Sequence, residues 1–136
     1  PKQDFNRFLP VIIKSCLNKK KFACSEGNQL RDFTHIDDVT NMIYLIFKKK
    51  AKYKNKIFNI CSNNTIHIKK LITNIKKIIN IKYLNISKNN LDVYKTNGDN
   101  NKIIKEINYK RKFVKIENVL LSIINWYKKY KIYNLN

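Results

Sequence analysis

The spacing of apolar residues along the chain predicts five helices. In each of them apolar side chains recur every three or four residues, which places them on one face of a helix. The second helix is expected to begin at a cap formed by Asp37 or Asp38. Its expected buried face consists of Val39, Met42, Ile43, Ile46 and Phe47. The five expected helices cover about residues 6–18, 37–50, 69–80, 100–107 and 116–131.

Short apolar runs between polar clusters predict the strands. The run 56–61 is apolar on both faces, as expected for a strand buried inside a larger parallel sheet. Residues 87–98 form the one loop of note, and it ends in an Asn-Gly pair. The expected strands cover about residues 22–24, 31–36, 56–61, 66–68 and 83–86.

Composition limits the class of protein. A chain of 136 residues is long enough for one domain, and 43% apolar residues suffice for a core. The sequence has no apolar run of 18 residues and no signal peptide, so we expect no membrane span and a cytoplasmic location. Cys16, Cys24 and Cys61 lack zinc-site spacing and are expected to be free thiols in a reducing compartment.

The net charge of +20 raises the question of nucleic-acid binding. Only three of the 29 basic residues are arginine, although arginine is favoured where bases or phosphates are read specifically. The lysines are spread over every segment together with Asn and Ile, which is typical of a codon bias toward A and T. We therefore expect weak polyanion binding through charge, and no specific nucleic-acid partner.

Residues 27–39 form a distinctive motif. Gly27 is followed two positions later by a glutamine, then by Arg31-Asp32-Phe33 and by an Asp that opens a helix. This motif resembles the C-terminal part of the extended short-chain dehydrogenase/reductase family, and in particular its nucleotide-sugar epimerases, dehydratases and reductases. Three further segments agree with that family in order and spacing: residues 1–10, residues 58–71 and the stretch from Asp99 through Trp126.

The resemblance implies a fold and a set of binding residues. The chain would be an α/β, C-terminal portion of an extended Rossmann-type enzyme, with small mixed strands, about five helices and a single partial domain over residues 1–136. Arg31 would contact the diphosphate of a nucleotide-sugar, for which its planar fork is suited. Phe22 would lie beside the nucleotide base, Phe8 would line the sugar pocket, and Lys88 would replace a second arginine of the family.

Other readings of these residues stay open. Arg31 would alternatively pair with Asp32 or with another neighbouring carboxylate. Phe22 and Phe8 are as well explained by ordinary core packing. Asp32 is expected to orient a neighbouring turn, and Asp38 to cap a helix rather than to act as an acid. His35 and His67 have no carboxylate or cysteine at useful spacing, so we assign them neither a metal nor a catalytic role.

The cofactor machinery of the family has no counterpart in the sequence. Its dinucleotide loop needs three glycines, and the chain has two in all. The letters of the catalytic Tyr-x-x-x-Lys occur at Tyr44 with Lys48 and at Tyr127 with Lys131, both on expected helices in the wrong part of the family pattern. The chain alone is therefore predicted to bind no cofactor or metal and to be inactive.

The resemblance then implies a function for the intact enzyme. NAD or NADP, held by an N-terminal half, would exchange hydride with the sugar of a UDP-, dTDP-, CDP- or GDP-sugar, in the synthesis of surface polysaccharides. Implied partners are the nucleotide-sugar, the N-terminal half and, for the intact enzyme, a second copy. The alternatives are a non-catalytic binding or scaffold module and a basic nucleic-acid-associated protein. The nucleotide, the sugar and the type of reaction stay open.

Overall fold

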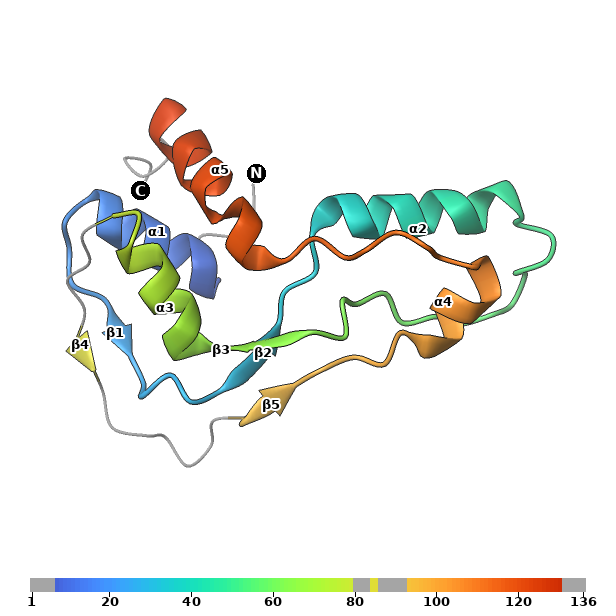
Figure 1. Ribbon diagram of the computed structural model, residues 1–136, viewed down its shortest axis with the longest axis horizontal. Helices are drawn as coiled ribbons and strands as arrows, with labels where there is room; N and C mark the ends of the chain where they lie inside the picture. The colour runs from blue at the N-terminus through green and yellow to red at the C-terminus, as the bar shows by residue number, and fades with distance from the viewer. Residues whose placement is uncertain (1–6, 80–83, 86–92, 131–136) are drawn as a thin grey trace. The chain divides into compact units, whose positions relative to one another are not determined.

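The structure, a computed structural model, describes residues 7–79, 84–85 and 93–130 (Figure 1). Packing divides the chain into two compact units. Unit 1 comprises residues 1–28, 67–92 and 117–136, and unit 2 comprises residues 29–66 and 93–116. The helices are α1 (Phe8–Leu17), α2 (Ile36–Lys48), α3 (Ile68–Lys76), α4 (Asn101–Ile107) and α5 (Ile116–Lys129). The strands are β1 (Ala23–Cys24), β2 (Leu30–Asp32), β3 (Thr65–His67), β4 (Leu84–Asn85) and β5 (Lys95–Thr96).

In its described residues, unit 1 combines three helices with one pair of parallel strands. Strand β1 pairs with β4, so that Ala23 lies opposite Leu84. Helices α1, α3 and α5 each bury one apolar stripe, as their 3.6-residue periodicity predicts. The largest side chains fully removed from solvent on these helices are Ile12, Ile13, Leu71, Ile75, Leu120 and Ile124.

Unit 2 is built around helices α2 and α4 and a three-stranded sheet. The sheet has the order β3-β2-β5, and β2 and β5 run parallel, with Arg31 opposite Thr96. The core of the unit lies between α2, α4 and the segment after α4, and its fully packed members are Met42, Ile103 and Tyr109. Strand β2 leads into α2 after three residues, so the position of β2 is tied to that core.

The start of α2 differs from the sequence prediction. The N-cap is His35, whose Nδ1 accepts a hydrogen bond from the backbone N–H of Asp37 at 3.3 Å. The prediction that Asp37 or Asp38 caps the helix was wrong, because both residues already lie within its first turn. Asp37 is exposed, whereas the Asp38 side chain is completely buried.

The prediction of a buried strand over residues 56–61 was also wrong. None of these residues is in a strand, and Ile57 is 83% exposed. Burial alternates along the segment: Phe58 and Ile60 pack against the core of unit 2, whereas Ile57 and Asn59 are exposed. A segment that is apolar on both faces is buried on both only if other elements cover both of them. The described part of unit 2 covers one face of residues 56–61.

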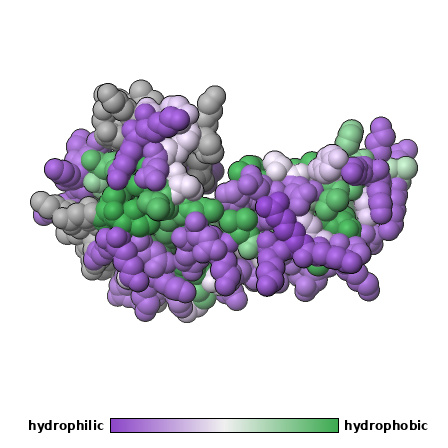
Figure 2. Space-filling view, turned by 45° about the horizontal axis from the view of Figure 1, so that its top comes forward, coloured by the Kyte–Doolittle hydropathy of each residue, from purple (hydrophilic) through white to green (hydrophobic). Residues whose placement is uncertain are grey.

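The expected buried face of α2 is correct only in part. Met42 is fully buried and Ile46 is partly buried, but Ile43 is 52% and Phe47 67% exposed. Figure 2 shows hydrophobic surface between hydrophilic side chains in this unit. The helix is apolar over a wider arc than one core can cover, and periodicity alone does not say which part of that arc is buried.

The observed elements confirm the α/β fold class with five helices and small strands. Strand β5 lies inside the segment that was expected to be a loop, and the expected helix 69–80 ends four residues early, at Lys76. The structure has two compact units, and the interpretation of residues 1–136 as a single partial domain stays a prediction. Within the described ranges, no helix is both long and apolar enough to cross a membrane.

Candidate functional site

Arg31 is the central residue of β2 and is half-buried. Its Nη1 donates to two backbone carbonyls, to Leu30 O at 2.9 Å and to Tyr94 O at 3.4 Å. Tyr94 directly precedes β5, so the pairing of β2 with β5 holds the guanidinium in place. None of the ion pairs among the described residues includes Arg31. Its positive charge is therefore fixed by neutral acceptors and is not neutralised by a carboxylate in the described part of the chain.

Asp32, the next residue of β2, is the centre of a hydrogen-bond network. Its Oδ1 accepts from Thr34 Oγ1 at 3.2 Å and from both the hydroxyl and the backbone N–H of Ser62. Its Oδ2 accepts from the backbone N–H of Asn63 at 2.8 Å. The carboxylate thus binds the turn after residue 61 to the end of β2. This confirms the prediction that Asp32 orients a neighbouring turn.

The turn over residues 61–64 is held from its other side as well. Asn63 has a left-handed backbone, with φ of 53°, and its Oδ1 accepts from Asn97 Nδ2 at 3.0 Å. Asn100 is buried and donates from Nδ2 to the carbonyl of Cys61 at 2.8 Å. Ser62 and Asn63 are not predicted from the sequence as partners of Asp32. The cluster of Ser, Asn and Asn was a turn signal, but a turn signal does not name a distant partner.

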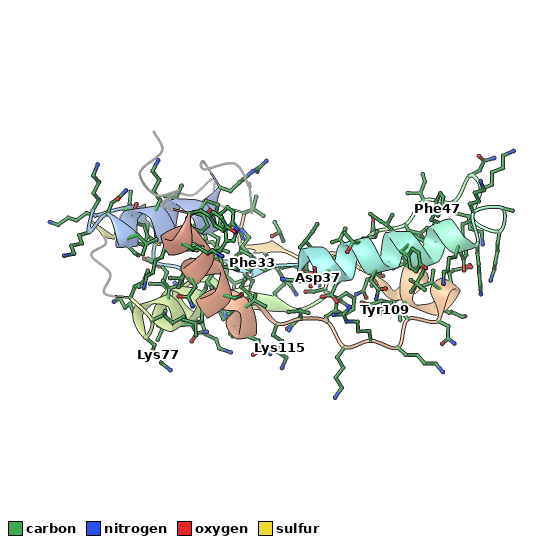
Figure 3. The ribbon with its side chains drawn as sticks, turned by 90° about the horizontal axis from the view of Figure 1, so that it is seen from above. Phe33, Asp37, Phe47, Lys77, Tyr109 and Lys115 are labelled. Carbon is green, nitrogen blue, oxygen red and sulfur yellow. The ribbon has the colours of Figure 1, made fainter. Side chains whose placement is uncertain are left out.

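Asp38 joins the start of α2 to the segment after α4. Its carboxylate accepts from Tyr109 Oη at 3.1 Å and from the backbone N–H of Val114 at 2.8 Å. Figure 3 shows Tyr109 beside α2, and Asp37 at the start of that helix. Burial is the main cause that raises the pKa of the Tyr109 phenol, so the phenol stays a donor at neutral pH. Asp38 is therefore a structural acceptor of unit 2.

The other predicted binding residues do not belong to unit 2. Phe8 is the first residue of α1 and is partly buried, and Phe22 is 6% exposed within the core of unit 1. Lys88 lies outside the described residues. The structure thus describes Arg31 in one unit and the two phenylalanines in the other. Their contacts with a ligand stay predictions.

The histidines and cysteines take part in local packing. His67 Nδ1 is 2.9 Å from the carbonyl of Asn28, which requires that nitrogen to be the donor. Burial raises the pKa of Cys16 from 9.0 to about 11 and also raises the pKa of Cys24 and Cys61. These thiols are protonated at neutral pH and are poor nucleophiles. Among the described residues, no group of three His, Cys, Asp or Glu side chains is placed to hold a metal ion.

One of the two occurrences of the Tyr-x-x-x-Lys letters lies on the surface of helix α2. Tyr44 and Lys48 lie one turn apart on α2, with Lys48 Nζ 4.7 Å from the centre of the Tyr44 ring. Tyr44 is 53% exposed. Tyr127 is buried in α5, and Lys131 lies outside the described residues. The contact of Tyr44 with Lys48 is an ordinary cation–π pair along a helix.

Comparison with known proteins gives matches of sequence and of fold. Residues 1–61 match the NAD dependent epimerase/dehydratase family. The chain is 33% identical over 129 residues to the uncharacterized protein MJ1055 of Methanocaldococcus jannaschii, and 43% identical over 49 residues to CDP-abequose synthase of Salmonella typhimurium. The UDP-glucuronic acid 4-epimerase of Bacillus cereus, solved with UDP-glucuronic acid and NAD, superposes with a TM-score of 0.82 over 96% of this chain, at 22% identity.

The family model thus covers 61 of the 136 residues of the chain. The fold matches that of an extended short-chain dehydrogenase/reductase over part of its length. The chain spans less than half the length of the proteins it matches. It covers 38% of the Methanocaldococcus protein, 16% of CDP-abequose synthase and 42% of the Bacillus epimerase.

Proposed function

We propose that this chain is the nucleotide-sugar-binding part of an NAD(P)-dependent epimerase, dehydratase or 4-keto reductase. In this proposal Arg31 contacts the diphosphate of the nucleotide-sugar. The intact enzyme acts in the cytoplasm, on sugars for surface polysaccharides, and forms a homodimer. The reaction takes place where the sugar meets a cofactor held by an N-terminal half. The role of this chain is to hold and orient the substrate, which lowers the entropic cost of the reaction.

The state of Arg31 carries the proposal. Its guanidinium is placed by two carbonyl groups, and no carboxylate in the described residues neutralises it. An arginine fixed in this way keeps donors for a second ligand, and a planar fork suits the paired oxygens of a diphosphate. The Bacillus epimerase, which has the same fold over this region, contains a UDP-sugar and NAD.

The exposed apolar residues of unit 2 support the need for an N-terminal half. Ile43, Tyr44 and Phe47 on α2 are each more than half exposed, and Ile57 is exposed to 83%. Figure 3 shows Phe47 near the end of α2. Large apolar side chains gathered on one unit are typical of a surface that another part of a protein covers. We propose that the half that holds the cofactor covers them.

Equilibrium dialysis of the chain against UDP, dTDP, CDP and GDP tests the proposal. We expect at least one of the four to bind. Arg31→Lys, which keeps the charge and loses the fork, should weaken that binding about tenfold. Arg111→Lys is the matched control, since Arg111 is exposed and also lies in unit 2. Equal affinities of the wild type and Arg31→Lys would refute the assigned role of Arg31.

A further inference from the structure

The carboxylate of Asp32 does not face the same way as the side chain of Arg31. The two residues are consecutive in β2, and successive side chains of a strand point to opposite faces of the sheet. Among the residues that the structure describes, the Asp32 carboxylate accepts hydrogen bonds from Thr34, Ser62 and Asn63. The Asp32 carboxylate therefore holds the backbone next to Arg31, and its two oxygens accept hydrogen bonds from four donors.

The backbone around Arg31 has supports on both sides of β2. On one side the pairing with β5 and the carbonyl of Tyr94 hold the guanidinium. On the other side β2 neighbours β3 in the sheet, and the Asp32 carboxylate also binds the end of β2 to the turn over 61–64, which leads into β3. The same turn also contacts the segment after β5, through the Asn63–Asn97 and Cys61–Asn100 hydrogen bonds. The network thus closes a loop of contacts around the strand that carries Arg31.

We propose that Asp32 is a positioning residue for an anion at Arg31. By binding Thr34 and the turn at Ser62 and Asn63, it fixes the end of β2 so that the guanidinium keeps the orientation a diphosphate requires. The proposal rests on the proposed contact between Arg31 and a diphosphate. It adds a residue that never touches the ligand and yet sets its affinity.

The direction in which Asp32→Asn changes the affinity for an anion distinguishes a positioning role of Asp32 from an effect of its charge. Asp32 is a negative charge close to the place where the anion would bind, and its removal by Asp32→Asn lowers the electrostatic repulsion of that anion. If charge alone decided, the variant would bind an anion about twofold more tightly at moderate salt. If Asp32 positions Arg31, the same variant binds about three- to tenfold more weakly, because the asparagine amide cannot accept all four hydrogen bonds.

Two further variants separate these effects. Ser62→Ala removes one hydrogen-bond donor to Asp32 without any change of charge. If Asp32 positions Arg31, this variant binds the anion more weakly, whereas if charge alone matters its affinity is unchanged. Asp37→Asn removes the same charge as Asp32→Asn from an exposed residue of unit 2 outside the network. It should bind as the wild type does, or slightly more tightly.

The experiment is equilibrium dialysis of the 136-residue chain and its variants against inorganic pyrophosphate at near-physiological salt. Circular dichroism at the same temperature confirms that each variant is folded, and Ser62→Ala decides if Asp32→Asn does not fold. Weaker binding by Asp32→Asn and Ser62→Ala, with Asp37→Asn unaffected, supports the proposal. Binding by Asp32→Asn as tight as the wild type, or an unchanged Ser62→Ala, overturns it. Equal pyrophosphate binding by wild type and Arg31→Lys would instead count against the proposed function.

Discussion

Asp37 and Asp38 are adjacent acidic residues in very different surroundings. The side chain of Asp37 is 64% exposed, and its Oδ2 lies 3.6 Å from His35 Nδ1. Asp38 is 0% exposed and accepts from Tyr109 and Val114, which lie 71 and 76 positions further along the chain. A buried carboxylate without donors would be very costly, so these two bonds are a condition for the packing of α2.

We predict that Asp38→Ala lowers the free energy of unfolding by about 2–4 kcal/mol, because it leaves the Tyr109 hydroxyl and the Val114 N–H without their acceptor. Asp37→Ala is the matched control, and it should change stability by less than about 0.5 kcal/mol. Chemical denaturation monitored by circular dichroism measures both values. Similar losses for the two variants would show that Asp38 does not hold α2 in the way described.

The sequence predicts which positions are important better than it predicts the contacts that their side chains make. Arg31 and Asp32 were singled out from a motif, and the role of Asp32 in orienting a turn is confirmed. The sequence predicts Asp38 to be a helix cap because an aspartate suits a cap as well as a buried acceptor, and local sequence does not separate the two roles. Histidine is a much less frequent cap, which is why His35 was missed.

At the scale of elements, the turn over 61–64 packs closely against the segment that precedes α4. A Cβ placed on Gly98 would lie 2.5 Å from Cys61 Sγ and 2.9 Å from its Cβ. Glycine is therefore needed at position 98 because the Cys61 side chain fills the adjacent space. The same two segments are joined by the hydrogen bond from Asn100 to the carbonyl of Cys61.

We predict that Gly98→Ala destabilises the chain by about 1–3 kcal/mol, the usual cost of overpacking. Cys61→Ala removes the nearer of the two clashing atoms, so the double variant should lose less stability than the two single losses added together. Thermal and urea denaturation of all four proteins gives the coupling energy. Strict additivity would mean that the contact between residues 61 and 98 is not as close as the structure has it.

Periodicity predicted the five helices because each buries at least one stripe of apolar residues. It predicted the strands less well. The segment 56–61 has the composition of a buried strand, but in the structure it is extended chain with one covered side. Strand β5 consists of two exposed residues within a segment predicted to be a loop, and it has no apolar pattern to detect. Strand pairing depends on partners distant in sequence, which a local pattern does not contain.

At the scale of the whole molecule, we predict that the isolated chain self-associates. Phe47 and Ile43 on α2 are large exposed apolar side chains, and they gain by contact with a second apolar surface. The double variant Ile43→Gln with Phe47→Gln should shift sedimentation velocity profiles toward monomer. Leu121→Gln, which changes a residue of α5 that is 55% exposed, is the control and should have a smaller effect. A wild-type monomer with a sharp, reversible and concentration-independent thermal transition would contradict this expectation.

The central claim is that Arg31 recognises a diphosphate, and one comparison tests it directly. For the nucleoside diphosphate that binds most tightly, its affinity is measured beside that of the matching nucleoside, at near-physiological salt, for the wild type, Arg31→Lys and Arg111→Lys. We predict that the wild type and Arg111→Lys prefer the diphosphate equally, and that Arg31→Lys loses about tenfold of that preference, because its ammonium has no fork. The same preference in all three proteins would contradict the account, since the diphosphate would then be held by the general charge of the chain.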